Sequence, residues 1–240
     1  ANPAALPGVT MPDGSQAYAV DNPHYLGPVI LAQGKVAGLA ATLPAAAAKP
    51  VRITFYNLLP NSTSGGNLLL PVDESVPGSG LGPALPGGAG DKYTQNRATI
   101  HLHGNNTVWI SDGNTHQWIT PARETTPYPA GVSALNVPDM GPGCDAIAGT
   151  GRPGDPATRK SSGCMTFFYT NAQSARLQFY HDHAHGITRL NVYAGEAAGY
   201  LLTDAVEGDL INGTNLTGVN EGPGTSTPFK KVLPGLGIPL

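Results

Sequence analysis

The sequence predicts an all-β fold, a Greek-key β-sandwich with long loops rich in glycine and proline. Gly and Pro supply 32 and 23 of the 240 residues, which favours a loop-rich β domain over a helical one. Short segments rich in β-branched and aromatic residues alternate with turn-forming residues. The chain has no internal repeat and no regular alternation of strand and helix patterns, which argues against a βαβ architecture.

Six short segments are expected to form the strands, and they follow one another along the whole chain. Residues 49–59 show the clearest pattern, because Val51, Ile53 and Phe55 fall on one face. The others are "PVILA" (28–32), "RATIHLH" (97–103), "MTFFYT" (165–170), "ARLQFYHDH" (175–183) and "AAGYLLTD" (197–204). The segment "NAQS", between the strands at 165–170 and 175–183, predicts a hairpin. The segment "GITRLNVYAG" predicts a single helical turn. Residues 60–90 and 121–163 are expected to form long loops.

Charge and hydropathy exclude two classes of partner. The formal net charge of −3 at pH 7 gives no basic surface for nucleic acid. No apolar run approaches the roughly 18 residues that a membrane span requires. We therefore expect neither nucleic acid nor a membrane as a partner.

The two cysteines, Cys144 and Cys164, flank 19 residues rich in Gly, Pro, Ser and charge, which are typical of a surface loop. Because both lie at the mouth of one loop, a disulfide is favoured over two free buried thiols. Such a bridge would stabilise the fold by about 3 kcal/mol in the chain-entropy model. It also predicts an oxidising location, either extracellular or periplasmic.

Four of the seven histidines form two H-x-H pairs, His101 with His103 and His181 with His183. Residues i and i+2 of a strand point to the same face, so each pair places two imidazoles side by side. If the two strands are neighbours, four imidazoles converge, and imidazole suits copper, zinc, iron and nickel. A cupin site needs a carboxylate where Thr107 and Val108 stand, and a copper–zinc superoxide dismutase has one H-x-H rather than two.

Several spaced segments resemble the first cupredoxin domain of a multicopper oxidase: "HLHG", "ISDGNTHQW", "YHDHAHGITRLNVYAGEAAGYLLTD" and, more loosely, "KPVRITFYNLLP". The similarity is closest to the branch of bacterial laccases, spore-coat oxidases and bilirubin oxidases. The resemblance implies a cupredoxin-like sandwich and copper as the cofactor. It also implies coupling of one-electron substrate oxidation to the four-electron reduction of O2 to water at a trinuclear copper cluster.

The resemblance also assigns residues to that cluster. His101 would be a ligand of the type 2 copper, and His103, His181 and His183 would be ligands of the type 3 pair. Asp112 matches an acidic residue that assists proton delivery, which suits a reaction that consumes protons; the alternative is an ordinary turn aspartate before Gly113. His185 departs from the family pattern and is interpreted as structural, while His116 and His24 are interpreted as surface or packing residues.

The remaining ligands of the family are not in this chain. The type 1 copper requires a cysteine in an H-C-H motif, and neither Cys144 nor Cys164 has one. We therefore expect residues 1–210 to form the first domain and 211–240 a linker to a following domain outside this chain. A second polypeptide, or the remainder of the oxidase, would supply the other ligands, and activity would depend on it.

Two other functions stay open on the sequence alone. The chain could be a non-catalytic copper-binding module for storage or delivery, or a redox-silent structural subunit. In the oxidase, the small reducing substrate could be a phenol, a bilirubin-like pigment or a metal ion.

Overall fold

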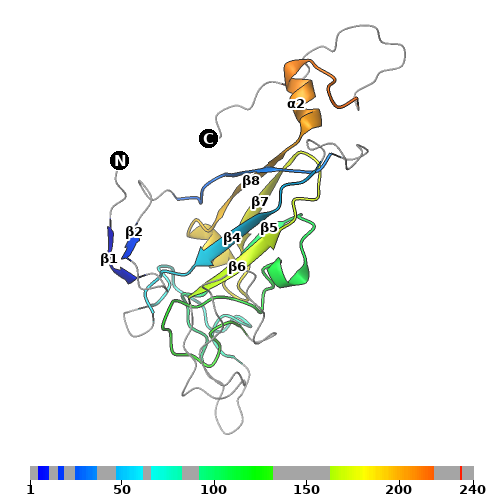
Figure 1. Ribbon diagram of the computed structural model, residues 1–240. Helices are drawn as coiled ribbons and strands as arrows, with labels where there is room; N and C mark the ends of the chain where they lie inside the picture. The colour runs from blue at the N-terminus through cyan, green and yellow to red at the C-terminus, as the bar shows by residue number, and fades with distance from the viewer. Residues whose placement is uncertain are drawn as a thin grey trace.

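The structure, a computed structural model, describes residues 5–10, 16–18, 25–36, 47–61, 66–82, 92–131, 163–218 and 233. Most of its regular structure is strand (Figure 1). The strands are β1 (Ala5–Thr10), β2 (Gln16–Tyr18), β3 (Ile30–Gln33), β4 (Val51–Tyr56), β5 (Ile100–His103), β6 (Cys164–Tyr169), β7 (Arg176–Asp182) and β8 (Ala197–Thr203). The helical segments are the short 3-10 turn η3 (Trp109–Ser111), α1 (Thr188–Tyr193) and α2 (Ala205–Asn212).

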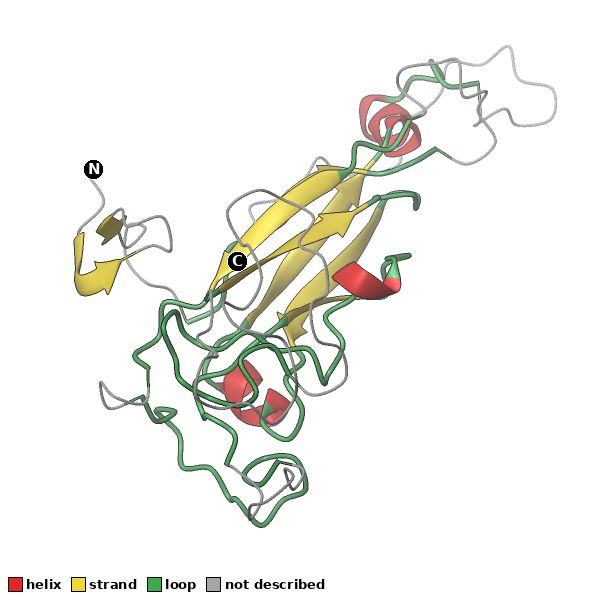
Figure 2. Ribbon diagram, turned by 60° about the horizontal axis from the view of Figure 1, so that its bottom comes forward, coloured by secondary structure: helices red, strands yellow, loops and turns green. Residues whose placement is uncertain are grey.

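Two sheets build the body of the domain. The larger has the strand order β3-β8-β7-β5, in which β3 runs parallel to β8 and the other neighbours are antiparallel. The smaller pairs β4 with β6. Strands β1 and β2 form an antiparallel pair of their own. Figure 2 shows the strands of the main body lying together, with most of the loops gathered at one end of them.

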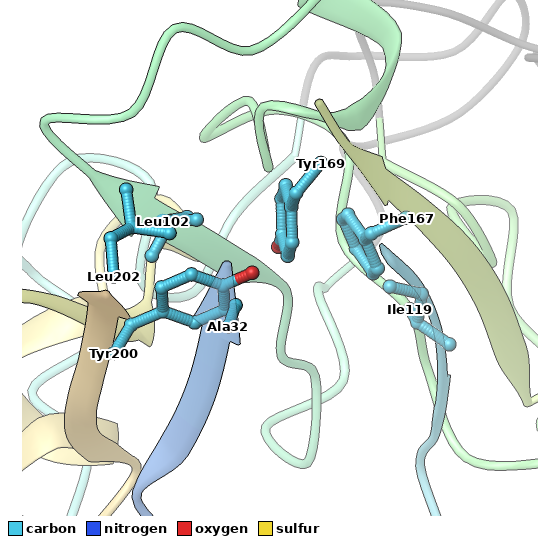
Figure 3. Packing of buried hydrophobic residues seen from close by; sticks show 7 residues of the cluster. All are labelled: Ala32, Leu102, Ile119, Phe167, Tyr169, Tyr200 and Leu202. Carbon is cyan, nitrogen blue, oxygen red and sulfur yellow. The ribbon is translucent and has the colours of Figure 1, made fainter. Parts of the chain in front are cut away.

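The hydrophobic core lies between the two sheets, because each strand alternates its side chains between faces. From the larger sheet come Leu102, Tyr200 and Leu202, and from the smaller come Phe167 and Tyr169; all are buried. Figure 3 shows these two groups of side chains facing one another. Full burial of one such side chain contributes roughly 1.5–3 kcal/mol. The predicted all-β sandwich is therefore confirmed.

The predicted hairpin across "NAQS" is wrong. Strand β6 pairs with β4, and β7 pairs with β5 and β8, so the connection crosses from one sheet to the other. Asn171 fixes this crossing in a left-handed conformation, with φ of 53°. Its side chain donates to the Lys49 carbonyl (2.7 Å) and accepts from the Tyr200 hydroxyl (2.8 Å). A polar side chain that bonds to both sheets cannot be recognised from a four-residue turn.

The helical segments match expectation only in part. The predicted turn after the second histidine motif is confirmed as α1. Helix α2 was not predicted; Asp204 caps its start by accepting from the Glu207 N–H (2.9 Å), and Gly213 ends it at a φ of 72°. The expected boundary between residues 210 and 211 falls inside α2, and the division into domain and linker stays a prediction. No helix in the described ranges has the length and apolar character needed to cross a bilayer.

Two of the sequence-based interpretations concern residues that the structure does not describe. Cys144 and His24 both lie outside the described ranges. Cys164 is buried at the start of β6. The disulfide between Cys144 and Cys164 therefore stays a prediction.

Candidate metal centre

The register of β5 against β7 brings the two histidine motifs together. His101 stands directly opposite His181 in this antiparallel pair. The residues between the histidines, Leu102 and Asp182, point to the other face and are buried, with 1% and 2% of their surface exposed. The histidines therefore lie on the outer face of the larger sheet, as the i, i+2 spacing predicts.

The four imidazoles converge on one small region. Ligand-capable nitrogens of His101, His103 and His181 all lie within 4.8 Å of one another. The fourth ring, that of His183, stacks on His101 with 4.5 Å between centroids and 18° between planes. Strands β5 and β7, with the residue that follows β7, thus present four nitrogen ligands where the sequence predicted a metal centre.

Backbone carbonyls fix the orientation of three of these rings. The Nδ1 atoms of His101 and His183 donate to the carbonyl oxygens of Asp112 (2.6 Å) and Gly113 (2.8 Å), and His181 Nδ1 donates to Asp182 O (2.6 Å). A carbonyl oxygen only accepts, so each Nδ1 carries the hydrogen and each Nε2 keeps its lone pair. Metal-binding histidines are commonly held in this way by a hydrogen bond from the other ring nitrogen.

His103 is held differently from the other three. Its Nδ1 lies 3.2 Å from the Nε2 of His181, so ligand-capable nitrogens of the two rings face each other. Its ring stacks on Phe179, with 4.6 Å between centroids and 18° between planes. In the β5–β7 register Phe179 is directly opposite His103, so the sheet itself creates this contact.

The "SDG" turn supplies two of the three orienting carbonyls. Segment η3 ends at Ser111, Asp112 is its C-cap, and Gly113 follows with a φ of 67°. A Cβ on Gly113 would overlap the carbonyl of Ile100, so only glycine lets the turn press this closely on β5. The sequence pointed to the carboxylate of Asp112 and to neither carbonyl, although the Asp-Gly pair is typical of a tight turn.

The carboxylate of Asp112 also lies at the cluster. Its Oδ1 is 3.5 Å from His101 Nδ1, and 43% of the side chain is exposed. The group therefore contacts both solvent and the hydrogen-bonded side of a candidate ligand. This position is compatible with the predicted role in proton delivery.

Electrostatics favour a neutral imidazole at His181. Burial is the main cause that lowers the pKa of His181, and the neighbouring His101, His183 and His103 lower it further. A neutral ring keeps the lone pair that a metal ion needs. The donor set fits copper, since imidazole is a preferred ligand of that metal.

His185 lies apart from the four. Its ring contacts His116, with 4.6 Å between centroids. Its backbone N–H donates to the Thr115 carbonyl (2.9 Å), beyond the end of β7. The third histidine of "HDHAH" therefore anchors a loop, in keeping with its interpretation as structural.

Arg97 is a supporting residue that the sequence analysis missed. It is 1% exposed, and burial lowers its pKa to about 10. Its guanidinium donates to the carbonyls of Gly78 (2.9 Å) and His185 (3.0 Å) and lies 5.1 Å from the ring centre of Trp118. One buried cation thus ties the loop after the second histidine motif to a distant loop. A lone arginine before a strand carries no signal of such a role.

No protein-family model matches the chain. Curated relatives do. The chain is 31% identical over 170 residues to multicopper oxidase LPR1 homolog 1 of Oryza sativa subsp. japonica, a match covering 70% of this chain and 21% of the relative. It is 32% identical over 114 residues to a laccase of Bacillus stratosphericus, covering 48% of this chain and 16% of the relative. A bilirubin oxidase of Albifimbria verrucaria is 52% identical over 46 residues, covering 19% of this chain and 8% of the relative.

Two solved structures of multicopper oxidases also match this chain in part. A laccase-like multicopper oxidase from Ochrobactrum sp. matches 78% of this chain and 22% of its own, at 15% identity and a TM-score of 0.37. A multicopper oxidase variant from Aquifex aeolicus matches 88% and 26%, at 19% identity and a TM-score of 0.35.

The three curated relatives are named as oxidases of related kinds: a multicopper oxidase, a laccase and a bilirubin oxidase. The chain spans about a fifth or less of the length of these curated relatives. On their evidence a multicopper oxidase domain is supported, since the chain is similar to part of each of these full-length relatives.

Proposed function

We propose that this chain supplies half of the histidine ligands of a trinuclear copper cluster in a multicopper oxidase. His101 would bind the type 2 copper, and His103, His181 and His183 would bind the type 3 pair. The observation that carries the proposal is the convergence of these four imidazoles, three from β5 and β7 and the fourth from His183 directly after β7. Three of the rings are held by carbonyls that leave Nε2 available.

Bound copper would supply the chemistry that reduces O2 to water with electrons from a reducing substrate. The residues of this chain would hold and orient the ligands and handle protons. Asp112 would carry a proton on its carboxylate; the proposal is supported by the 3.5 Å between Oδ1 and His101 Nδ1 and by the exposure of the side chain. The carbonyl of the same residue would keep the His101 ring in place throughout.

The rest of the oxidase would come from outside this chain. We propose that a second polypeptide, or the remainder of a longer protein, carries the other cluster ligands and the type 1 copper. Relatives named laccase and bilirubin oxidase leave phenols and bilirubin-like pigments as candidate reducing substrates, and a metal ion is a third. The predicted disulfide supports a secreted or periplasmic protein.

Copper content and O2 uptake of the complete oxidase, measured in parallel, test the proposal. Replacing His183 by Ala should remove copper and reduce O2 uptake by at least about 10-fold. In other metal sites, the loss of a residue that only holds a ligand in place already costs about 10- to 100-fold. His185→Ala is the matched control, since His185 belongs to the same motif but contacts His116. Full copper and full O2 uptake in His183→Ala would exclude the assignment.

Spectroscopy and O2 uptake of the same preparations distinguish an oxidase from a copper carrier. An oxidase should show type 1 blue absorption, a type 3 band near the ultraviolet and O2 uptake that depends on the reducing substrate. A storage or delivery module would show only ordinary type 2 copper and no O2 uptake. Mass spectrometry of the intact protein should reveal the remaining domains, either as added mass or as a second chain.

A further inference from the structure

Asp182 sits between two candidate copper ligands but faces away from them. The strand alternation that turns His181 outward turns Asp182 into the interior. The side chain is 2% exposed. A carboxylate buried this deeply is costly unless its oxygens accept hydrogen bonds, so its partners show what holds it there.

The two carboxylate oxygens accept from two different chain segments. Oδ1 accepts from the backbone N–H of Thr99 at 2.8 Å, and Oδ2 accepts from the backbone N–H of Ala184 at 3.0 Å. Thr99 is two residues before His101, and Ala184 directly follows His183. One side chain therefore bridges the segments that carry the first and the second histidine motifs.

Backbone contacts place this bridge at the end of the β5–β7 ladder. The N–H of His183 donates to the Thr99 carbonyl at 3.2 Å, and the N–H of Asp182 donates to the Glu196 carbonyl at 3.0 Å. Strand β7 ends at Asp182, so His183 lies beyond the last residue of the strand. The position of His183 relative to His101 then depends on contacts outside the two strands. The carboxylate makes two of these contacts, one with Thr99 before β5 and one with Ala184 after β7.

The pattern of donors distinguishes this bridge from an ion pair. The buried cation nearest in sequence to the first motif, Arg97, donates to the carbonyls of Thr94 (2.6 Å) and Gly78 (2.9 Å). Asp182 instead accepts from the backbone N–H groups of Thr99 and Ala184, and the Asn191 side chain is a further hydrogen-bonding neighbour. Burial raises the pKa of Asp182 to about 6, and hydrogen bonds from Thr99 and Ala184 oppose that rise.

We propose that Asp182 is a positioning residue that sets the spacing of the two histidine motifs, and hence the geometry of the copper ions between them. The inference rests on the proposed function, since it assumes copper at the four histidines. It concerns a residue that would contact neither copper nor substrate. It predicts that loss of the carboxylate bridge disturbs the cluster even when all four ligands are present.

Asp182→Asn in the complete oxidase tests the proposal. Asparagine keeps one acceptor oxygen, but its NH2 group faces one of the two N–H donors, so one arm of the bridge is lost. We expect a changed type 2 copper EPR spectrum and a fall in kcat on the order of 10-fold. The kcat/KM for the reducing substrate should stay unchanged, because that substrate would deliver electrons at a type 1 copper outside this chain, so its KM should fall together with kcat.

Asp209→Asn is the matched control. Asp209 is also 2% exposed, and it also accepts backbone bonds, from Leu216 (3.0 Å) and Thr217 (2.9 Å), at the end of α2. This variant should lose stability without any change in EPR spectrum or kcat. If Asp182→Asn behaves in the same way, Asp182 has only a structural role and the proposal is overturned.

A second variant covers the case in which Asp182→Asn does not fold. Asp182→Glu keeps the charge and both oxygens but lengthens the bridge by one methylene. The proposal requires an altered EPR spectrum in this variant, and a wild-type spectrum would overturn it. Copper content and O2 uptake of the wild-type oxidase are measured first. If the wild type shows neither, the proposed function fails, and the inference fails with it.

Discussion

Asp112 acts at His101 through two chemically separate groups. Its backbone carbonyl orients the imidazole, and its carboxylate lies 3.5 Å from the same nitrogen and reaches solvent. A side-chain substitution changes the second group and leaves the first in place. The two roles can therefore be separated by a single mutation.

Asp112→Asn in the complete oxidase should slow O2 reduction by roughly 100-fold, the lower end of the range for a lost proton donor or acceptor. Copper content should not change, since the carbonyl that holds His101 remains. Oxygen uptake and copper analysis of the same sample check both statements. Asp73→Asn, at an exposed turn, serves as the control. Unchanged turnover at full copper would refute the proton role.

At the scale of the elements, the β5–β7 pair determines which side chains meet at the metal centre. The register sets His101 opposite His181 and Phe179 opposite His103. Phe179 is 47% exposed, yet its ring stacks on His103. An exposed aromatic residue on the outer face of the sheet thus supports the one histidine that no described carbonyl holds.

Phe179→Ala should weaken copper binding at limiting copper by about 2- to 10-fold, the equivalent of a stacking contact of 0.5–1.5 kcal/mol. The expected cause is greater freedom of the His103 ring. Leu177→Ala is the control, because Leu177 is on the same face of β7, two residues earlier, and more exposed. Copper titration with a competing chelator measures the effect, and equal affinities of the two variants would contradict it.

The same elements explain what the sequence could and could not predict. The spacing of His101 and His103, and of His181 and His183, was enough to predict a shared face, since strand periodicity is local. The prediction that all four histidines meet assumed that β5 and β7 are neighbours. The sequence could not show this pairing, because strand order depends on contacts between residues distant in sequence. Two further features depend on that pairing: the contacts of the Asp112 and Gly113 carbonyls, and the bridge made by Asp182. No sequence motif marks either of them.

For the whole molecule, burial of acidic groups beneath the metal centre gives the stability a defined pH dependence. Glu196 lines a cavity of about 650 Å³ between the sheets, together with Tyr169 and Tyr180. Burial, and next the charge of Asp182, raise the pKa of Glu196 to about 8 from an ordinary value of 4.5. The folded protein therefore holds a proton that the unfolded chain has released across this interval.

The contribution of Glu196 to the free energy of unfolding should fall as the pH rises from about 4.5 to 8, because the folded chain keeps the Glu196 proton there and the unfolded chain does not. Glu196→Gln, which cannot ionise, should flatten this part of the profile. Urea midpoints at pH 5 and pH 8 measure the slope, with Glu74→Gln at an exposed ion pair with Lys92 as the control. An equal slope in wild type and Glu196→Gln would show that Glu196 does not titrate in this way.

The most direct test of the account is the position of copper in the complete protein. Anomalous diffraction at the copper edge should show peaks at bonding distance, about 2 Å, from ring nitrogens of His101, His103, His181 and His183. It should show none beside His116 and His185. Copper-replete crystals without peaks at the four histidines would contradict the account.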